Sequence, residues 1–244
     1  MPGSNVGGAV AALRANPRIR KLAGRVRGLA GLRSGEDSLR LLLAFTLSAD
    51  ANCIDVGAHR GDVLRDMLRL APQGRHIAYE PIPELAAGLA REFPGVDVRN
   101  AALSDSAGET SFVHVRSNPA YSGFREREYP GEEQLEHLTV RTERLDDVLP
   151  DGYVPALVKV DVEGAELQVF RGMAETLARH RPVVFFEHGQ GAADRYGTSS
   201  SEVHDLLVGH AGLRIFDERG GGPYSRDEFE ALFTQPIWNF VAHR

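Results

Sequence analysis

Short apolar runs, separated by longer stretches with helical spacing, dominate the chain from about residue 51 onward. Runs of this length and composition are typical of buried strands in a parallel sheet. Four of them end in a carboxylate, and these are Cys53–Asp55, His76–Glu80, Leu157–Asp161 and Val183–Glu187. Because ligands of open α/β sheets bind beyond the carboxyl ends of the strands, we predict a binding site along this row of acids.

The stretches between the runs place apolar residues every three or four positions, as amphipathic helices do. Alternating strands and helices predict a doubly wound α/β domain. The helices are expected at 36–48, 61–70, 84–93, 165–179, 202–210 and 227–233. Further strands are expected at 96–100, 110–115, 138–142, 213–217 and 238–242. The last two, joined by a short connection, are expected to pair as antiparallel neighbours at a sheet edge.

Polar loops interrupt this alternation at 116–137, 189–201 and 219–226. The first of them also carries three aromatic side chains. A loop this long in a compact domain is usually functional or disordered. We therefore expect these loops to select the substrate, although loop composition does not name it.

The composition is that of an ordinary globular protein, with 42% hydrophobic and 25% charged residues among 244. The formal net charge of −6 argues against general affinity for nucleic acid, so no such partner is predicted. The single cysteine, Cys53, cannot build a disulfide framework, which favours a reducing compartment and a cytoplasmic location. No apolar stretch approaches the roughly 18 residues that cross a bilayer, so no membrane span is predicted.

Positive charge is concentrated at the start of the chain. Residues 1–35 contain seven arginine or lysine residues and no acid, with small and apolar residues between them. This pattern predicts a basic N-terminal helical extension, and a helix that lies on an anionic membrane surface stays open as an alternative. The predicted domain then comprises residues 36–244.

The first carboxylate-ending strand leads into a turn of small residues, Asp55-Val-Gly-Ala-His-Arg-Gly61. Gly57 and Gly61 permit a sharp bend and the close approach of a ligand, and the following helix offers free amide donors. Glu80 ends the next strand 19 positions after Gly61, where an acid commonly receives ribose hydroxyls. The turn lacks the Gly-x-Gly-x-x-Gly spacing of dinucleotide enzymes. Together these residues favour a nucleotide-like ligand, and the alternative is a tight turn beside a surface glutamate.

Ionisable residues gather at the ends of the next two carboxylate-ending strands. Strand alternation places Lys159 and Asp161 on one side of the sheet, with Glu163 following. Lys159 is expected to neutralise Asp161, and Glu163 can alternatively be a simple helix-start acid. Glu187 and His188 end the neighbouring strand at the same edge. We expect these groups to converge and to shift one another's pKa values, as acid–base chemistry requires.

The order of several segments resembles the FkbM family of S-adenosylmethionine-dependent methyltransferases. These segments are the turn Asp55–Gly61, Tyr79-Glu-Pro81, Asn100-Ala-Ala-Leu-Ser-Asp105, Lys159-Val-Asp-Val-Glu-Gly-Ala-Glu166 and Glu187-His188. The resemblance runs from about residue 51 to the end, and the segment that begins at Lys159 is its most specific part. The chain departs from many relatives at His59-Arg60, where they have asparagine and a small aliphatic residue.

This resemblance implies a class I methyltransferase fold, which is a Rossmann-like α/β architecture. Its seven-stranded sheet is mostly parallel with an antiparallel last strand, and helices cover both faces. The resemblance also implies S-adenosyl-L-methionine as cofactor and a small-molecule acceptor as partner. The residues assigned to the cofactor are Asp55, Gly57, His59, Gly61, Glu80, Ala102, Leu103, Ser104 and Asp161. The resemblance implies that Glu80 holds the ribose and that Ala102–Ser104 lie near the adenine.

Methyl transfer from a sulfonium is an in-line displacement, in which the cofactor supplies the activated carbon. The enzyme must align the acceptor and remove its proton. For a hydroxyl on a small polyhydroxylated, sugar or natural-product substrate, the candidate bases are Asp161, Glu163 and His188. Mg²⁺ could also acidify a bound hydroxyl, and its candidate ligands are Asp161, Glu187 and His188.

Two other classes stay open as alternatives. A nicotinamide-dependent oxidoreductase shares the acid after the second strand, but the chain has no tyrosine followed four positions later by lysine. A non-catalytic cofactor-binding protein would keep the fold without turnover. Nitrogen or carboxyl acceptors, and the oligomeric state, are not decided by the sequence.

Overall fold

The computed structural model describes residues 35–129 and 131–244. The chain divides into two compact units, residues 1–41 and 42–244. Helix α3 (Gly35–Thr46) crosses this boundary and contains every described residue of the first unit. The predicted basic extension, residues 1–35, lies outside the described residues except for Gly35. The extension and the predicted domain boundary after residue 35 therefore stay predictions.

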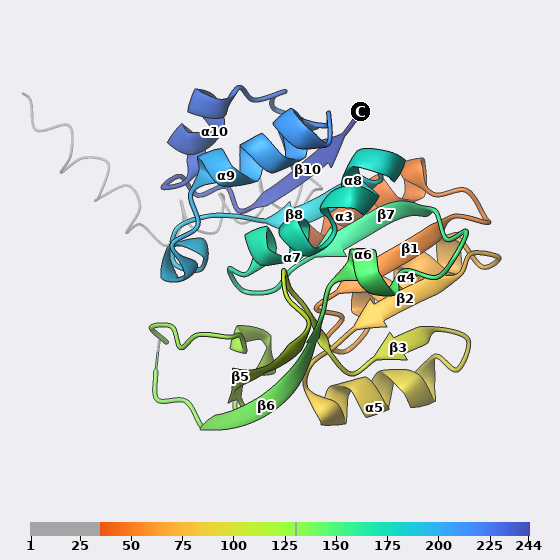
Figure 1. Ribbon diagram of the computed structural model, residues 1–244, viewed down its shortest axis with the longest axis vertical. Coiled ribbons are helices and arrows are strands. Elements are labelled where there is room, and N and C mark those ends of the chain that lie inside the picture. Colours follow the sequence, from red (N-terminus) through yellow and green to blue (C-terminus); the bar gives the residue numbers. More distant parts are fainter. Residues whose placement is uncertain (1–34, 130) are drawn as a thin grey trace, which may run out of the picture. The chain divides into compact units, whose positions relative to one another are not determined.

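A seven-stranded sheet organises the second unit, with the strand order β3-β2-β1-β7-β8-β10-β9 (Figure 1). The strands are β1 (Asn52–Val56), β2 (His76–Tyr79), β3 (Asp97–Arg99), β7 (Pro155–Val160), β8 (Val183–Glu187), β9 (Arg214–Asp217) and β10 (Asn239–His243). The first five pair in parallel, and β10 runs antiparallel to both of its neighbours. The predicted class I sheet with a reversed last strand is confirmed.

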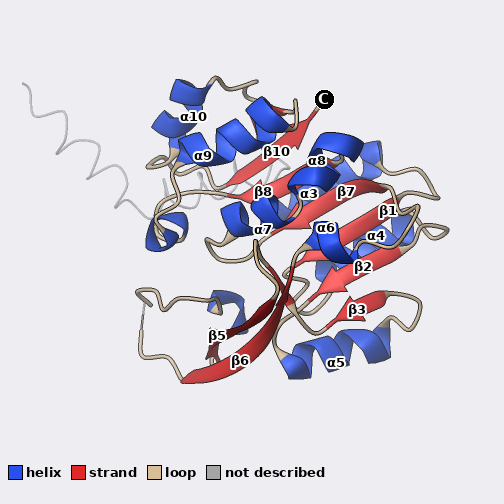
Figure 2. Ribbon diagram, viewed as in Figure 1, coloured by secondary structure: helices blue, strands red, loops and turns tan. Residues whose placement is uncertain are grey.

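Helices cover both faces of this sheet (Figure 2). On one face, α4 (Asp62–Leu70) and α5 (Pro83–Glu92) bury Leu64 and Leu89 with Ala78 of β2. The other face holds the larger core, where Phe170 and Phe229 pack with sheet residues. The elements of the second face are α6 (Leu145–Val148), α7 (Glu166–Gly172), α8 (Ala174–His180), α9 (Ser200–His204), its π-helical continuation η3 (Asp205–His210) and α10 (Arg226–Leu232).

The helix predicted over 165–179 is two helices, α7 and α8, which meet at Met173. Gly172 explains the break, because a β-carbon there would lie only 2.0 Å from the carbonyl oxygen of Ser104. Glycine is therefore required where the end of α7 touches a neighbouring chain segment, and glycine also disfavours helix propagation. The sequence pattern shows the buried face of this region but not the close approach that divides it.

A second sheet of three strands has the order β4-β6-β5 and lies beside the main sheet (Figure 1). Its strands are β4 (Ala102–Leu103), β5 (Gly108–Val115) and β6 (Leu135–Glu143). Strands β5 and β6 form an antiparallel hairpin, as the predicted strands at 110–115 and 138–142 suggest. Their connection, residues 116–134, is called the β5–β6 loop below, and it contains the short helix η1 (Pro119–Tyr121). Within the described residues, no helix is long and apolar enough to cross a membrane.

Candidate functional site

The turn after β1 lies where the sheet order reverses, between β1 and β7. Gly57 has φ of 76°, and a β-carbon there would lie 2.0 Å from the carbonyl oxygen of Asp161. Gly61 has φ of 78°, and its β-carbon would lie 2.7 Å from side-chain atoms of both Leu89 and Phe93. The backbone of Asp161 leaves no room for a side chain at Gly57, and the positive φ favours glycine at both positions, as the predicted sharp bend requires.

Glu80 lies beside this turn at the end of β2. Its Oε2 accepts a hydrogen bond from the backbone amide of His59 at 2.8 Å, and its Oε1 accepts one from the amide of Ile82 at 2.9 Å. Burial raises the pKa of Glu80 to about 7, although these two hydrogen bonds act to lower it. Each carboxylate oxygen keeps a further lone pair, so the group is oriented and can still accept hydrogen bonds from a ligand.

Lys159 connects the turn to the end of β7. Its ammonium lies 3.3 Å from Asp55 Oδ1 and 3.4 Å from Asp161 Oδ2, and it donates a hydrogen bond to the Gly57 carbonyl at 2.7 Å. Burial opposes the positive charge, but the two aspartates outweigh it and raise the pKa of Lys159. The predicted pairing of Lys159 with Asp161 is confirmed. Asp55 is fully buried, so its predicted direct contact with a cofactor stays a prediction.

The three residues assigned to the adenine, Ala102–Ser104, are all buried. The side chain of Asn100, just before them, donates hydrogen bonds to the backbone carbonyls of Glu80 and Pro81, both at 3.0 Å. These bonds hold the start of this segment next to the end of β2. The predicted ribose and adenine residues are therefore neighbours, and their contact with a cofactor stays a prediction.

The chain leaves β7 through a strained turn that carries Glu163. This residue has φ of 57°, in the left-handed region that residues other than glycine rarely adopt. Oε1 of Glu166 accepts hydrogen bonds from the amides of Val162 and Gly164, both at 3.2 Å, on either side of Glu163. Because α7 begins only at Glu166, Glu163 precedes the helix and is not a helix-start acid.

Asp161, Glu163 and Glu187 form what we call the acidic cluster, at the ends of β7 and β8. Burial raises the pKa of Glu163 to about 8, with a contribution from Asp161, and Arg127 of the β5–β6 loop acts to lower it. Burial, Asp161 and Glu163 likewise raise the pKa of Glu187 to about 8, against Lys159 and Arg127. These carboxyl groups therefore shift one another's pKa values.

His188 does not join the acidic cluster. Its Nε2 forms a hydrogen bond with Ser200 Oγ at 2.8 Å, and its ring centre lies 5.3 Å from those of Phe229 and Phe233. Burial lowers its pKa to about 4, so the ring is neutral at neutral pH. His188 follows the last residue of β8 and belongs to the loop that leads to α9. In this conformation His188 contacts Ser200 and two phenylalanine rings, and its predicted role as a base stays a prediction.

The candidate Mg²⁺ ligands are not assembled into a site. Among residues 35–129 and 131–244, no three histidine, cysteine, aspartate or glutamate side chains are grouped so that they could hold a metal ion. Asp161 and Glu187 lie in the acidic cluster, but His188 is engaged with Ser200. The donor geometry gives the Mg²⁺ prediction no support.

Two polar loops pack against the strained turn, namely the β5–β6 loop and the β8–α9 loop (residues 188–199). A β-carbon on Gly123 would lie 3.2 Å from the hydroxyl of Tyr196 and 3.7 Å from the Glu163 β-carbon. A β-carbon on Gly164 would lie 2.4 Å from the Ala192 carbonyl oxygen. The β8–α9 loop also contains η2 (Ala193–Tyr196). Two of the three loops that the sequence assigns to substrate selection thus meet at the candidate site, and their role in selection stays a prediction.

Two side chains at this site are missing from the sequence-based set of site residues. Glu166 belongs to the most specific motif, but its spacing does not show that its carboxylate folds back onto the turn. Arg127 forms an ion pair with Glu163 from a loop that carries no motif. The presence of aromatic residues in that loop is the only sequence signal that could have directed attention to it.

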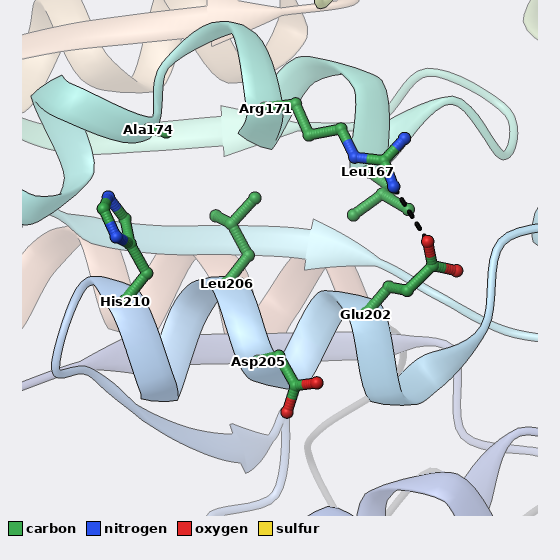
Figure 3. A pocket seen from close by; sticks show the side chains of 7 residues that line it. All are labelled: Leu167, Arg171, Ala174, Glu202, Asp205, Leu206 and His210. Carbon is green, nitrogen blue, oxygen red and sulfur yellow. Dashed lines mark hydrogen bonds and ion pairs between the residues drawn. The ribbon is translucent and has the colours of Figure 1, made fainter.

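A separate depression of about 370 Å³ lies between α7 and α9 with η3 (Figure 3). Leu167 and Leu206 form its apolar part, and His210 lies at one end. Arg171 and Glu202 form an ion pair of 2.8 Å at the other end. None of the residues assigned above to cofactor, catalysis or metal belongs to this described lining, so it is distinct from the predicted site.

A family model described as the methyltransferase FkbM domain matches residues 55–217. This range is well over half of the chain and includes the glycine turn, Glu80 and the acidic cluster. The chain therefore belongs to the FkbM methyltransferase family, and the family predicted from the sequence is confirmed.

Individual relatives cover this chain to different extents. The AMB antimetabolite synthetase AmbE of Pseudomonas aeruginosa is 29% identical over an alignment 203 residues long, and the match covers 67% of this chain and 10% of AmbE. The 2-O-methyltransferase NoeI of Sinorhizobium fredii is 26% identical over 182 residues, covering 64% of this chain and 73% of NoeI. A solved structure of methyltransferase FkbM from Methylobacillus flagellatus KT is similar with a TM-score of 0.52 at 14% identity. It covers 81% of this chain and 44% of that one, and it supports the fold.

Proposed function

We propose that this protein is an S-adenosylmethionine-dependent O-methyltransferase that acts on a hydroxyl of a small polyhydroxylated, sugar or natural-product molecule. The observation that carries the proposal is that Lys159 joins the turn after β1 to Asp161 of the acidic cluster. The residues assigned to the cofactor and the candidate bases are thus connected at the reversal point of the sheet. Membership of the FkbM family supports methyl transfer, and the relative NoeI, a 2-O-methyltransferase, supports oxygen as the acceptor atom.

The residues around the turn fit an adenosyl cofactor. The Glu80 carboxylate is oriented by two backbone amides and can accept hydrogen bonds from ribose hydroxyls. Within the described part of the chain, the buried Nε2 of His59 has no hydrogen-bond partner, so it can bind a polar group of the ligand. Gly57, Gly61 and Asp161 would complete this end of the site, and Ala102–Ser104 would border the adenine. When bound, S-adenosylmethionine supplies the activated methyl group.

We assign the removal of the acceptor's proton to Glu163. A catalytic base is most effective when its pKa lies near the working pH, and that of Glu163 is raised to about 8. Its backbone is held in a strained conformation, which is common for residues at functional sites. Asp161 is a second candidate base, and its side chain is 39% exposed beside Lys159. His188 has no part in this proposal, because its ring is bonded to Ser200.

A small molecule is the acceptor that these features favour. The two polar loops pack against the turn that carries Glu163, and such loops commonly determine specificity. The formal net charge of −6 disfavours a nucleic-acid acceptor. The free, buried Cys53 is consistent with the predicted cytoplasmic location, which stays a prediction.

Calorimetric titration with S-adenosylhomocysteine tests cofactor binding. We expect wild-type protein to bind, and Glu80→Ala to weaken binding by about 10-fold or more, because charge-assisted hydrogen bonds are lost. Glu84→Ala, an exposed acid on α5, is the matched control and should leave the affinity unchanged. A wild-type protein without measurable affinity would overturn the proposal.

Turnover distinguishes the enzyme from a non-catalytic cofactor-binding protein. Isotope-labelled S-adenosylmethionine would be incubated with methyl glycosides, inositol and catechols, and the methylated product identified by mass spectrometry. Label in a hydroxyl-derived ether is the expected result. Label on nitrogen or on a carboxylate in a wider panel would contradict O-methylation while leaving methyl transfer intact.

A further inference from the structure

Arg127 of the β5–β6 loop contacts the candidate base Glu163. Its Nη1 forms an ion pair with Glu163 Oε2, and its guanidinium carbon lies 4.8 Å from the ring centre of Tyr121. Tyr121 in turn stacks on Tyr129 with ring centres 6.4 Å apart. The side chains of Arg127 and Glu163 are 24% and 19% exposed. A pair this shielded from water interacts more strongly than a surface pair, so it restricts both partners.

The backbone of Glu163 is held independently of its side chain. The Glu166 carboxylate accepts hydrogen bonds from the amides on both sides of Glu163, whose φ is in the left-handed region. A strained residue persists only where its surroundings determine its conformation. Glu166 therefore holds the backbone of Glu163, and Arg127 contacts its carboxylate. The conformation of Glu163 thus depends on these two residues and not on its own backbone preference.

We propose that Arg127 is a positioning residue that holds the Glu163 carboxylate in place and thereby couples the β5–β6 loop to the base. The inference rests on the proposed role of Glu163. Orientation of catalytic groups is a large part of enzymatic rate enhancement, so loss of this restraint lowers turnover more than cofactor affinity. The same loop carries the stacked rings of Tyr121 and Tyr129, and Arg127 contacts Tyr121, so these aromatic side chains and the restraint on Glu163 belong to one structural unit.

The competing explanation is that the ion pair only fastens the loop. Arg125 provides a matched control, because it belongs to the same loop and its guanidinium carbon lies 5.7 Å from the ring centre of Tyr196. Arg125→Met removes a comparable side chain that is directed to Tyr196 instead of Glu163. A loop-fastening role predicts similar effects of Arg125→Met and Arg127→Met.

A double-mutant cycle separates the two explanations. The cycle measures kcat and KM of wild type, Arg127→Met, Glu163→Gln and the double variant. The substrate is the methyl glycoside, inositol or catechol that wild type methylates fastest. We expect Arg127→Met to lower kcat by about 10-fold or more in wild type but by less than about 2-fold in Glu163→Gln, because a restraint on an absent base has no effect. Arg127→Lys should retain part of the kcat that Arg127→Met loses. The affinity of every variant for S-adenosylhomocysteine should stay within about 2-fold of wild type, which would show that the variants are folded.

Equal losses of kcat in both backgrounds, or equal losses for Arg125→Met and Arg127→Met, would overturn the positioning role. Wild-type kcat in Glu163→Gln would overturn the assignment of the base together with this inference, while methyl transfer itself would stand. A second test of the Arg127–Glu163 pair uses NMR and needs no methyl acceptor. Slowly exchanging guanidinium N–H signals of Arg127, assigned with Arg127→Lys, should be present in wild-type NMR spectra and lost in Glu163→Gln, and their absence from wild type would overturn the inference.

Discussion

The ammonium of Lys159 lies 2.7 Å from the carbonyl oxygen of Gly57, so a buried cation of β7 fixes the turn at the end of β1. The same ammonium lies within 3.4 Å of carboxylates from Asp55 and Asp161. One side chain therefore connects the predicted cofactor crevice to the acidic cluster. The ammonium is thereby paired and hydrogen-bonded, as a buried charge generally must be, whereas the carboxylate oxygens of Asp55 accept no hydrogen bond from the described residues.

Removal of Lys159 should destabilise the protein strongly. Lys159→Met leaves the carboxylate of Asp55 buried without its partner, and breaking a buried ion pair in this way costs about 3–5 kcal/mol. Urea denaturation measures the free energy of unfolding. The double variant Lys159→Met/Asp55→Leu should recover part of the loss, because both charges are then gone. A loss below about 1 kcal/mol for Lys159→Met would show that the pair is a minor contributor.

Cofactor affinity should depend on pH through Glu80. The pKa of this carboxyl is raised to about 7, and ribose hydroxyls donate hydrogen bonds to its ionised form. The dissociation constant for S-adenosylhomocysteine should therefore increase as pH falls through about 7 and be constant at higher pH. Glu80→Gln, which cannot ionise, should bind weakly and with a flat profile. A wild-type profile as flat as that of Glu80→Gln would exclude Glu80 as the titrating group.

Thermal stability should decrease with rising pH because of Glu187. Its pKa in the folded protein is about 8, above the ordinary value of 4.5, so the folded state binds the proton more tightly than the unfolded state. The resulting stability is complete below about pH 4.5 and is lost as pH rises through about 8. The Tm of Glu187→Gln should fall less than that of wild type between about pH 4.5 and pH 8. Each kcal/mol of pH-dependent unfolding free energy corresponds to about 2–4 °C in Tm. Parallel Tm profiles for the variant and wild type, recorded by differential scanning fluorimetry, would contradict the burial of an ionising Glu187.

His188 should matter for stability and little for turnover. It forms a buried hydrogen bond with Ser200 and stacks on Phe229, away from the acidic cluster. We expect His188→Gln to cost about 1–3 kcal/mol of unfolding free energy and to change kcat by less than about 2-fold. Ser200→Ala should likewise lower the unfolding free energy and leave kcat nearly unchanged. A 100-fold lower kcat in a stable His188→Gln protein, roughly the effect of losing a base, would restore histidine as the base.

The sequence predicts those parts of the site that follow from strand alternation and strand ends. Lys159 and Asp161 are two positions apart on one strand, so their pairing is a local property. His188 follows the last residue of β8, so strand alternation does not determine its direction, and its ring contacts Ser200. The glycine turn was found, but the atoms that require its glycines come from other elements.

Contacts between distant segments account for what the sequence does not predict. The break at Gly172 depends on the approach of Ser104, which is 68 positions earlier in the chain. The pairing of Arg127 with Glu163 joins an irregular loop to a strand end 36 positions later. No periodicity or local motif encodes such contacts, because they depend on where the folded sheet places each loop.

A crystal structure of the protein with bound S-adenosylhomocysteine tests the central claim most directly. The account predicts ribose hydroxyls on the carboxylate of Glu80 and the adenine beside Ala102–Ser104. It also predicts that the amino-acid part of the ligand lies at the turn formed by Gly57 to Gly61. A ligand bound elsewhere, or one that leaves Glu80 without a contact, would contradict the account.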